Sequence, residues 1–433
     1  MAPRLRILVV GSSGFIGSAI CARLAADGHQ MTGISRSRPG PGILVHNHIR
    51  LDVAKATRAR DWRPVVQGID AVINCAGILQ DSPGESVQGV HAHGVRALIE
   101  ACETEGIRRI VHFSAIGVDR ETPTAFSRTK HEGDALLIAR DLDWVILRPS
   151  VVIGRAAYGG SALLRGLAAL PVLPVMPATG ALQFVHLDDV VDTVAFFLRP
   201  DAPARKVLEL AGPRPWSFSE AIQLFRRWMR WPQAHEIAVP AWLATAVYRL
   251  GDLASLLGWR PPVRTTAKRE MARGAVGDPG EWEAVTGIKP RDLEETLRRE
   301  PASVQERWFA RLYLLKPLAF GIFGLFWIAT GLISLGPGWN YGMDLLREGG
   351  TDETVAVAAI TAGALADIMI GMAILHRRTS RYGLYAALVI TVAYAVIGTI
   401  LVPRLWSDPL GSMLKIWPIL VFNLMTLAIL EDR

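Results

Sequence analysis

Four apolar stretches in the last third of the sequence constrain the fold more than any other feature. They cover residues 317–335, 355–375, 382–402 and 412–430. Each has about 20 residues, and a helix of that length crosses the roughly 30 Å hydrocarbon core of a bilayer. A buried bundle of a soluble protein is the alternative. We expect residues 303–433 to form an all-α bundle of four transmembrane helices.

The charges between these stretches predict their orientation. The 376–381 loop reads HRRTSR, whereas residues 336–354 carry several acidic side chains and residues 403–411 one arginine and one aspartate. Basic loops remain on the cytoplasmic side. This pattern predicts a multi-pass protein of a bacterial-type inner (plasma) membrane, with both termini and the N-terminal domain in the cytoplasm.

The formal net charge of +7 has a simple explanation in this setting. Lysine and arginine beside a bilayer face its anionic lipids, so the lipid bilayer is the expected partner. Nucleic-acid binding needs a basic stripe with interleaved aromatic residues, and the sequence contains no such stripe. We therefore expect no nucleic-acid partner.

Two polar residues, Asp367 and Asn423, lie inside the predicted membrane segments. A carboxylate is costly in hydrocarbon, so Asp367 needs a partner. The favoured interpretation is a hydrogen bond between the two side chains that holds helices together. A proton or polar-substrate site is the alternative.

The segment 240–258 is also apolar, but Arg249 and Asp252 interrupt it. Each of these charges would cost about 2.5–3.5 kcal/mol at the centre of a bilayer. The segment is therefore predicted to be an amphipathic helix. Two places remain open for it, the membrane surface and the preceding domain.

Residues 1–150 alternate short apolar runs with helical patterns, which is typical of a doubly wound parallel sheet in a Rossmann-like α/β domain. Helical patterns cover residues 85–105 and 126–140. Residues 151–300 contain several Pro and Gly breaks, and they are predicted to form a substrate lobe of the same domain. The strand-like runs cover residues 6–10, 30–34, 48–53, 70–77, 109–115 and 144–150.

A glycine-rich turn follows the first of these strands. The run VVGSSGFIGSAI places Gly11, Gly14 and Gly17 between a strand and the start of a helix. Glycine permits a tight turn and the close approach of a diphosphate to backbone N–H groups, and the helix N-terminus adds partial positive charge. The turn, with Phe15 and Ile16 inside it, is predicted to bind a dinucleotide.

The end of the second strand predicts which dinucleotide is bound. An NAD-specific site has a carboxylate there for the ribose 2′-hydroxyl, and GISRSR has none. Ser35, Arg36 and Arg38 can instead bond and neutralise a 2′-phosphate, which favours NADP(H) over NAD(H). A solvated basic loop is the alternative. The remaining predicted cofactor residues end the third and fourth strands: Asp52, Asn74, Ala76 and Gly77.

On these motifs, residues 1–300 resemble an atypical or extended short-chain dehydrogenase/reductase. The subgroup of greatest similarity is that of the Rossmann-like accessory subunit of respiratory complex I, whose members often bind NADPH with a degenerate catalytic set. Residues 303–433 resemble the DoxX-like four-helix membrane family through ALADIMIGMAIL and LWSDPLGSMLKIWPIL. The segments that carry the first resemblance are GSSGFIG, NCAG, VHFSA, FSRTKHEGD, RPSVVIG and QFVHLDDV.

The resemblance implies a catalytic serine, tyrosine and lysine. Ser114 and Lys130 occupy two of these positions, but Phe126 stands where active members have tyrosine. In the family the tyrosine transfers a proton, the lysine lowers the tyrosine pKa and holds the nicotinamide ribose, and the serine orients a carbonyl. Phenylalanine donates nothing, and a missing acid–base group typically costs about 10²–10⁴ in rate. His91 is an alternative proton donor, although a structural histidine is the favoured interpretation.

The sequence leaves two functions in balance. One is an NADP(H)-dependent oxidoreductase acting on a small lipophilic or quinone-like substrate. The other is a non-catalytic nucleotide-binding module that stabilises or senses redox state for a membrane (respiratory) complex, with another membrane protein as partner. A sugar-nucleotide epimerase needs the missing tyrosine even more and ranks last. The three cysteines have no ligand-like spacing, so no metal is expected.

Overall fold

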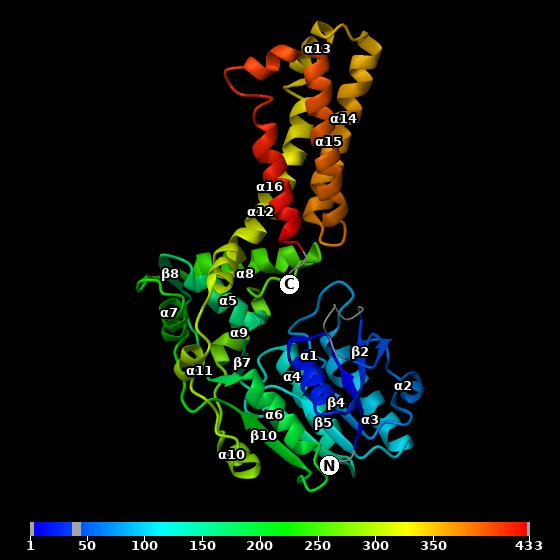
Figure 1. Ribbon diagram of the computed structural model, residues 1–433, viewed down its shortest axis with the longest axis vertical. Coiled ribbons are helices and arrows are strands. Elements are labelled where there is room, and N and C mark those ends of the chain that lie inside the picture. Colours follow the sequence, from blue (N-terminus) through cyan, green and yellow to red (C-terminus); the bar gives the residue numbers. More distant parts are fainter. Residues whose placement is uncertain (1–3, 37–44, 431–433) are drawn as a thin grey trace. The chain divides into compact units, whose positions relative to one another are not determined.

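The computed structural model describes residues 4–36 and 45–430, and it divides into two compact units (Figure 1). The N-terminal unit contains Met1–Asp252 and Pro261–Ala310. The C-terminal unit contains Leu253–Arg260 and Arg311–Arg433. The short segment Leu253–Arg260 therefore belongs to the same unit as the apolar helices, although it lies far from them in the sequence.

A seven-stranded parallel sheet forms the centre of the N-terminal unit, with strand order β10-β6-β5-β4-β1-β2-β3. The chain starts in the middle of the sheet, builds to one edge and then to the other, which is the order of a doubly wound Rossmann sheet. The strands are β1 Arg6–Val10, β2 Gln30–Ser35, β3 Asn47–Arg50, β4 Ala71–Asn74, β5 Arg109–Phe113, β6 Asp143–Pro149 and β10 Lys206–Leu210.

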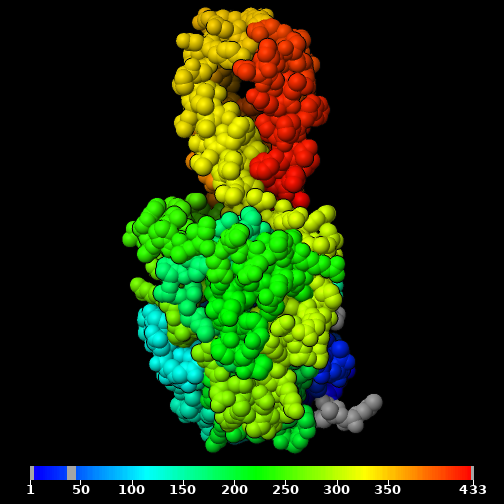
Figure 2. Space-filling view, turned by 90° about the vertical axis from the view of Figure 1, so that its left-hand side faces the viewer, coloured from blue at the N-terminus to red at the C-terminus, as the bar shows by residue number. Residues whose placement is uncertain are grey.

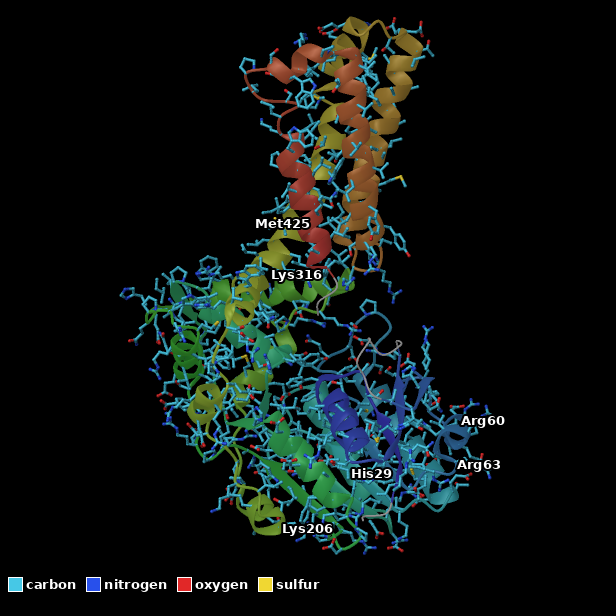
Figure 3. All side chains as sticks on the ribbon, in the orientation of Figure 1. His29, Arg60, Arg63, Lys206, Lys316 and Met425 are labelled. Atoms are coloured by element: carbon cyan, nitrogen blue, oxygen red, sulfur yellow. The ribbon has the colours of Figure 1, made fainter. Side chains whose placement is uncertain are left out.

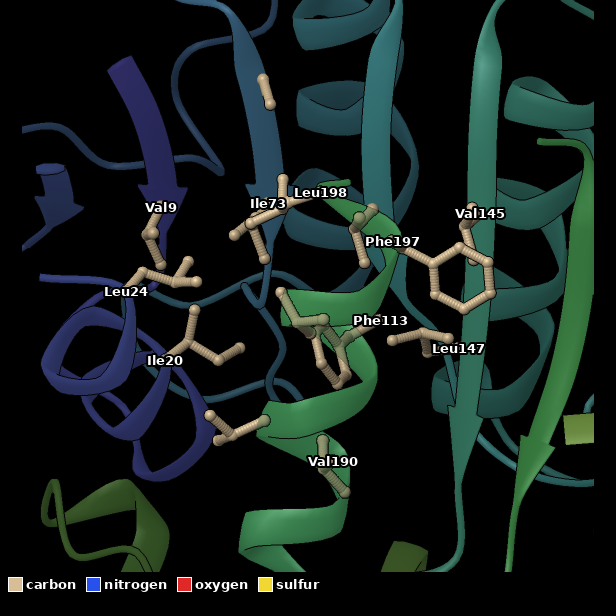
Figure 4. Packing of buried hydrophobic residues seen from close by; sticks show 14 of the residues in the cluster. Val9, Ile20, Leu24, Ile73, Phe113, Val145, Leu147, Val190, Phe197 and Leu198 are labelled. Atoms are coloured by element: carbon tan, nitrogen blue, oxygen red, sulfur yellow. The ribbon is translucent and has the colours of Figure 1, made fainter. Parts of the chain in front are cut away.

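Helices cover both faces of this sheet because successive strand residues point to opposite sides. On one face, strand residues such as Val9 and Ile73 pack against α1 (Phe15–Ala26) and α6 (Leu187–Phe197), as Figure 4 shows. On the other face, Leu8, Val10 and Val72 pack against the remaining helices. These helices are α2 Ala59–Val66, α3 Gly94–Thr104 and α4 Ala125–Ile138.

The rest of the N-terminal unit is a smaller lobe with two-stranded sheets. Strand β7 (Val151–Ile153) pairs with β9 (Phe184–His186), and β8 (Val172–Val175) pairs with β11 (His235–Ala238). Its helices are α5 Gly159–Ala168, α7 Phe218–Trp228, α9 Thr265–Arg273, α10 Gly280–Thr286 and α11 Leu293–Arg299, together with α8 (Ala241–Leu256) up to Asp252.

The C-terminal unit is a bundle of apolar helices. Among the described residues, three helices are long and apolar enough to cross a membrane: α12 Val304–Leu335, α14 Glu353–Leu375 and α15 Ser380–Leu401. In their most apolar windows only 17% to 28% of the residues are buried within the chain, so most apolar side chains face outwards, as in lipid-exposed helices. Figure 2 shows yellow α12 and red α16 (Ile416–Ala428) on one face. Phe323 of α12 packs edge-on against Phe422 of α16, with 5.4 Å between the ring centroids.

Two predicted membrane elements differ from the structure. The fourth segment, expected over 412–430, contains a helix of 13 residues, which spans only about 20 Å at 1.5 Å per residue. A turn that includes Gly411, with φ of +65°, delays its start. The loop expected between the first two spans contains a helix, α13 (Trp339–Glu348), and a 3₁₀ turn, η2 (Pro403–Ser407), follows α15.

The predicted hydrogen bond between Asp367 and Asn423 is wrong. The Asp367 carboxylate accepts a hydrogen bond from the Tyr394 hydroxyl at 3.0 Å, and Asn423 Nδ2 donates to the Leu384 carbonyl at 3.2 Å. Helices α14 and α15 are antiparallel, and Gly383 packs against Ala373. Asn423 therefore lies at the level of residue 373, which is about 9 Å along the bundle from Asp367.

Candidate nucleotide-binding site

The glycine turn after β1 has a geometry that only glycine permits. Gly11 has φ of +82°, and its N–H donates to the Ile34 carbonyl at 2.9 Å. The Gly11 carbonyl accepts the Gly14 N–H at 3.0 Å. A Cβ atom at Gly17 would lie 2.3 Å from the Gly11 carbonyl oxygen, so α1 can approach the turn this closely only with glycine at position 17.

The start of α1 fits an anionic group. The helix begins at Phe15, and its N-cap is Gly14, which offers no side chain to accept the first N–H groups. The N–H groups of the first turn, including those of Phe15 and Ile16, lack intrahelical acceptors, and the helix dipole adds partial positive charge. This cradle suits a dinucleotide diphosphate.

The carboxyl end of β2 carries two of the residues predicted for a 2′-phosphate. Arg36 forms an ion pair with Glu85 at 2.5 Å while its side chain remains 41% exposed, and Ser35 Oγ contacts His48 Nε2 at 2.8 Å. Arg38 lies outside the described residues. Asp52 follows β3, which ends at Arg50, and its carboxylate accepts the Ala54 N–H at 3.2 Å.

The end of β4 forms the floor of the site. Asn74 Nδ2 lies 3.1 Å from His112 Nδ1, and Asn74 Oδ1 accepts the Ala76 N–H at 3.2 Å. A Cβ atom at Gly77 would lie 3.4 Å from the Lys130 ammonium and 3.7 Å from His91 Nε2. The structure thus brings the β4 end, Lys130 and His91 together, as the sequence motifs predict.

Lys130 is held inside this floor. Its ammonium donates to the Phe113 carbonyl at 2.7 Å and to the Ala76 carbonyl at 3.4 Å. Only 5% of the residue is exposed, and burial lowers the pKa of Lys130 to about 8. Phe126 lies one turn earlier on α4, and its ring packs edge-on against the His91 ring at 5.6 Å.

Ser114 has a partner that the sequence analysis missed. Its hydroxyl donates to Asp134 Oδ2 at 2.9 Å, and the same carboxylate accepts from Arg148 Nε at 3.1 Å. Burial raises the pKa of Asp134, and the nearby Arg148 guanidinium opposes this shift. A serine hydroxyl carries one proton. While Ser114 donates it to Asp134, it has no proton to offer a substrate carbonyl.

His91 also has both ring nitrogens in use. It lies in a π-helical turn, η1 (Gly89–His93). Its Nε2 accepts the Ile78 N–H at 3.1 Å, so the proton is on Nδ1, which lies 2.9 Å from Thr129 Oγ1. Burial lowers the pKa of His91 well below its usual value, and the positive charge of Lys130 adds to this shift. The ring is therefore neutral, and its contacts are those of a structural histidine.

A second unexpected contact supports the start of α4. Ser127 Oγ donates to Glu270 Oε1 at 2.9 Å, and the hydroxyl of the N-cap residue Thr124 donates to the same oxygen. Glu270 lies on α9 and pairs with Arg273 at 3.0 Å. The smaller lobe thus contacts the first turn of the helix that carries Phe126 and Lys130. The sequence offers no local signal for a contact across 143 residues.

Comparisons with known proteins agree with this geometry. The family described as NAD(P)H-binding matches residues 11–165, and the DoxX-like family matches residues 324–424. The chain joins a short-chain-dehydrogenase-like NAD(P)-binding domain to a DoxX-like domain. The NAD(P)-binding domain is similar in fold to the solved structure of MoeE5 in complex with UDP-glucuronic acid and NAD. That match has a TM-score of 0.52 and 19% identity, and it covers 68% of this chain and 96% of the other.

Curated relatives match about half of this chain. A ceramide reductase of Caulobacter vibrioides is 27% identical over 208 residues, which cover 48% of this chain and 65% of the relative. The photosystem II assembly factor Ycf39 of Synechocystis is 25% identical over 228 residues, which cover 52% of this chain and 67% of the relative. The chain spans only 19% of the length of other relatives that it matches. The likeness to the complex I accessory subunit stays a prediction.

Proposed function

We propose that this chain is a membrane-anchored NADP(H)-dependent oxidoreductase that acts on a lipophilic, quinone-like acceptor. One observation carries the proposal: the glycine cradle for a dinucleotide is complete, but neither described residue at the family's serine and tyrosine positions beside Lys130 offers a proton. Phe126 has no donor, and the Ser114 hydroxyl proton is directed to Asp134. The acceptor must then be one that needs little help from an acid.

The acid requirement differs between acceptor classes. A bound nicotinamide supplies hydride. An ordinary carbonyl that takes hydride becomes an alkoxide, and we take the pKa of its conjugate acid to be close to that of water, about 15.7. A quinone that takes hydride becomes a phenolate-type anion, whose conjugate acid has a pKa like that of tyrosine, about 10. The difference corresponds to about 8 kcal/mol, so a quinone-like acceptor suits this site far better.

Two features support the choice of cofactor and substrate class. Ser35 ends β2 and Arg36 follows it, so the chain has no carboxylate of its own at these two positions, and the Arg36 guanidinium, which is paired with Glu85 and partly exposed, is suited to a 2′-phosphate. The DoxX-like domain gives the chain a membrane region in which lipophilic substrates dissolve, and the similar Caulobacter protein is named a ceramide reductase. These points favour NADP(H) and a small lipophilic substrate.

A second function is favoured by the same hydrogen bonds. Because Ser114 and His91 are both fully engaged with protein groups, the domain also suits a non-catalytic role. In that role a bound nucleotide stabilises the chain or reports redox state to another membrane protein of a larger, respiratory complex. The relative Ycf39 is named an assembly factor, which is a function of this class.

The two functions are separated by NADPH oxidation in the full-length protein. The protein is purified in lipid nanodiscs, extracted for bound nucleotide, and followed at 340 nm with NADPH and either a short-chain quinone or an aldehyde. We expect oxidation with the quinone only. Phe126→Tyr should add aldehyde reduction, because acid–base help is worth about 10²–10⁴ in rate. Phe196→Tyr, which adds the same hydroxyl on α6, is the control. Tightly bound NADPH that no acceptor oxidises would reject the enzyme and favour the second function.

A further inference from the structure

Helix α8 (Ala241–Leu256) has two apolar faces of different character. One is buried and consists of small or aromatic side chains: Ala244, Tyr248, Gly251 and Ser255 are all below 9% exposed. A Cβ atom at Gly251 would lie 1.8 Å from the Val263 carbonyl oxygen, so this face is packed against the backbone that follows. Packing within the protein therefore explains the apolar residues on this face of the helix, but not those on the other face.

The other face consists of large apolar side chains that project from the protein. They are Trp242 at 71% exposed, Leu243 at 40%, Leu250 at 64%, Leu253 at 57%, Leu256 at 65% and Leu257 at 40%. At about 100° per residue these six side chains fall within an arc of roughly 140°, and they extend over about 22 Å. We call these six residues the α8 apolar face. Soluble proteins rarely expose large apolar side chains in such a continuous stripe.

The chain at the end of this face is fixed to the end of a membrane-spanning helix. The Arg377 N–H donates to the Leu257 carbonyl at 2.9 Å, and Trp259 Nε1 donates to the Leu375 carbonyl at 2.6 Å. Leu375 is the last residue of α14. Trp259 also packs against Phe320 at 4.9 Å between ring centroids. The last turn of α8 therefore lies where α14 leaves the hydrocarbon region.

Positive charge gathers at the same place. The Arg377 guanidinium lies 5.6 Å from the centre of the Trp259 ring. Burial lowers the pKa of Arg377, and the neighbouring positive charges of Arg381 and Arg260 lower it further. Arg249 is exposed within the arc of the α8 apolar face, between Leu253 and Leu256 in a view down the helix. Aromatic and basic residues of this kind are typical of the boundary between hydrocarbon and headgroups.

We propose that α8 is an interfacial helix whose apolar face is immersed in the headgroup region of the bilayer, on the side of the basic 376–381 loop. An amphipathic helix with a basic flank lies in the membrane plane with its apolar face about 5–10 Å deep. The occupant of this face is therefore lipid, with a preference for anionic headgroups. The segment that follows α8 is hydrogen-bonded to the end of α14. This contact favours lipid over a second copy of the chain as the occupant of the α8 apolar face.

The buried face of α8 connects the bilayer to the nucleotide site. The Lys268 ammonium of α9 lies 5.8 Å from the centre of the Tyr248 ring, and Arg264 pairs with Asp252 at 3.2 Å. Helix α9 in turn supplies Glu270, which accepts the hydrogen bonds of Thr124 and Ser127 at the start of α4. Packed contacts therefore run from the buried face of α8 through α9 to the first turn of α4.

Site-specific labelling of the full-length protein tests the proposal. Leu250→Cys and Leu253→Cys are labelled with an environment-sensitive fluorophore in phosphatidylcholine nanodiscs, with or without phosphatidylglycerol. Ile138→Cys on α4, where the native side chain is also exposed at 45%, is the matched control. The wild-type chain sets the background, since Cys21 and Cys102 are buried and Cys75 is half-buried. We expect a blue shift at positions 250 and 253, and quenching there by nitroxide-labelled lipid.

Two outcomes would overturn the proposal. Labels at 250 and 253 that aqueous iodide quenches as strongly as the label at 138 would show a solvated face. Labels protected from iodide but unaffected by nitroxide lipid would show that a protein, such as a second copy, covers the face. Retained NADPH binding in each variant shows that the NAD(P)-binding domain has folded. Because none of these readouts needs turnover, the result is independent of whether the chain oxidises NADPH.

Discussion

At Gly17 the space of a single methyl group decides whether the nucleotide turn forms. A Cβ atom there would lie 2.3 Å from the Gly11 carbonyl oxygen, whereas one at Gly160 would have no atom within 4 Å. Overpacking typically costs about 1–3 kcal/mol. We expect Gly17→Ala to weaken NADPH binding about 10- to 100-fold, with Gly160→Ala as the unchanged control. Titration calorimetry measures both, and equal affinity in the two variants would contradict the assigned cradle.

Lys130 makes the stability of the folded protein depend on pH, which a residue that does not titrate cannot do. Burial lowers its folded-state pKa to about 8, against about 10.4 in an unfolded chain. Between these values the unfolded chain keeps the proton that the folded chain releases, so this group makes the protein more stable as pH rises. The full effect is about 3 kcal/mol.

The comparison with Lys130→Met isolates this effect, because methionine does not titrate and other groups titrate in both proteins. The melting temperature of the nucleotide-free wild type, minus that of the variant, should rise between pH of about 8 and about 10.4. Thermal unfolding in detergent followed by tryptophan fluorescence measures the difference. A difference that stays constant or falls would show that Lys130 is not desolvated.

Sequence motifs located residues that the structure brings together at the candidate site, but not what their side chains contact. Gly11, Ser114 and Lys130 follow strands or lie on a helix in a fixed spacing, so a pattern can find them. The contact of Ser114 with Asp134 depends on the fold, since it joins the end of β5 to α4 and brings in Arg148 of β6. No spacing rule gives the direction of a hydroxyl proton.

At the scale of elements, the carboxyl end of β2 decides between the two dinucleotides. Arg36 is paired with Glu85 at 2.5 Å, and a hydrogen bond to a charged group contributes about 1.5–3 kcal/mol. We expect Arg36→Ala to weaken NADPH binding about 10- to 100-fold and leave NADH binding unchanged. Arg60→Ala is the matched control, because this exposed arginine lies on α2 (Figure 3).

Glu85 supplies a second test of the same strand end. Its carboxylate would repel a 2′-phosphate bound beside Arg36, so Glu85→Gln should strengthen NADPH binding relative to NADH. Fluorescence titration with both nucleotides gives the ratio of affinities. If Arg36→Ala weakened both nucleotides equally, the assignment of a 2′-phosphate site would be wrong.

Element prediction succeeded where a pattern is repeated and failed where it is short. The six strand-like runs of residues 1–150 all correspond to strands. Five of these strands are largely buried apolar runs, as is typical of parallel strands, and the sixth is the more exposed edge strand β3. The seventh strand, β10, was not predicted, since its sequence KVLEL mixes charged and apolar residues at the edge of the sheet. Hydropathy predicted the bounds of α14 and α15 closely but overestimated the length of α16. The apolar sequence before α16 forms a turn and not a helix, and composition alone does not distinguish the two.

At the scale of the whole molecule, the DoxX-like domain has apolar helices long enough to cross a membrane, and the charges at their ends predict an orientation. The basic residues between α14 and α15 and the acidic residues around α13 differ strongly in charge, and basic loops stay in the cytoplasm. We propose on this ground that the NAD(P)-binding domain faces the cytoplasm, where NADPH is made. The orientation also decides which leaflet the α8 apolar face enters.

Cysteine accessibility in whole cells tests the orientation directly. Arg378→Cys lies in the basic loop and Asp344→Cys on α13, and both native side chains are exposed. A membrane-impermeant maleimide should label position 344 in intact cells and position 378 only after the membrane is permeabilised. The wild-type chain is the background control, because two of its three cysteines are buried. The reverse pattern would place the NAD(P)-binding domain outside, away from cellular NADPH, and the proposed oxidoreductase would then have no source of hydride.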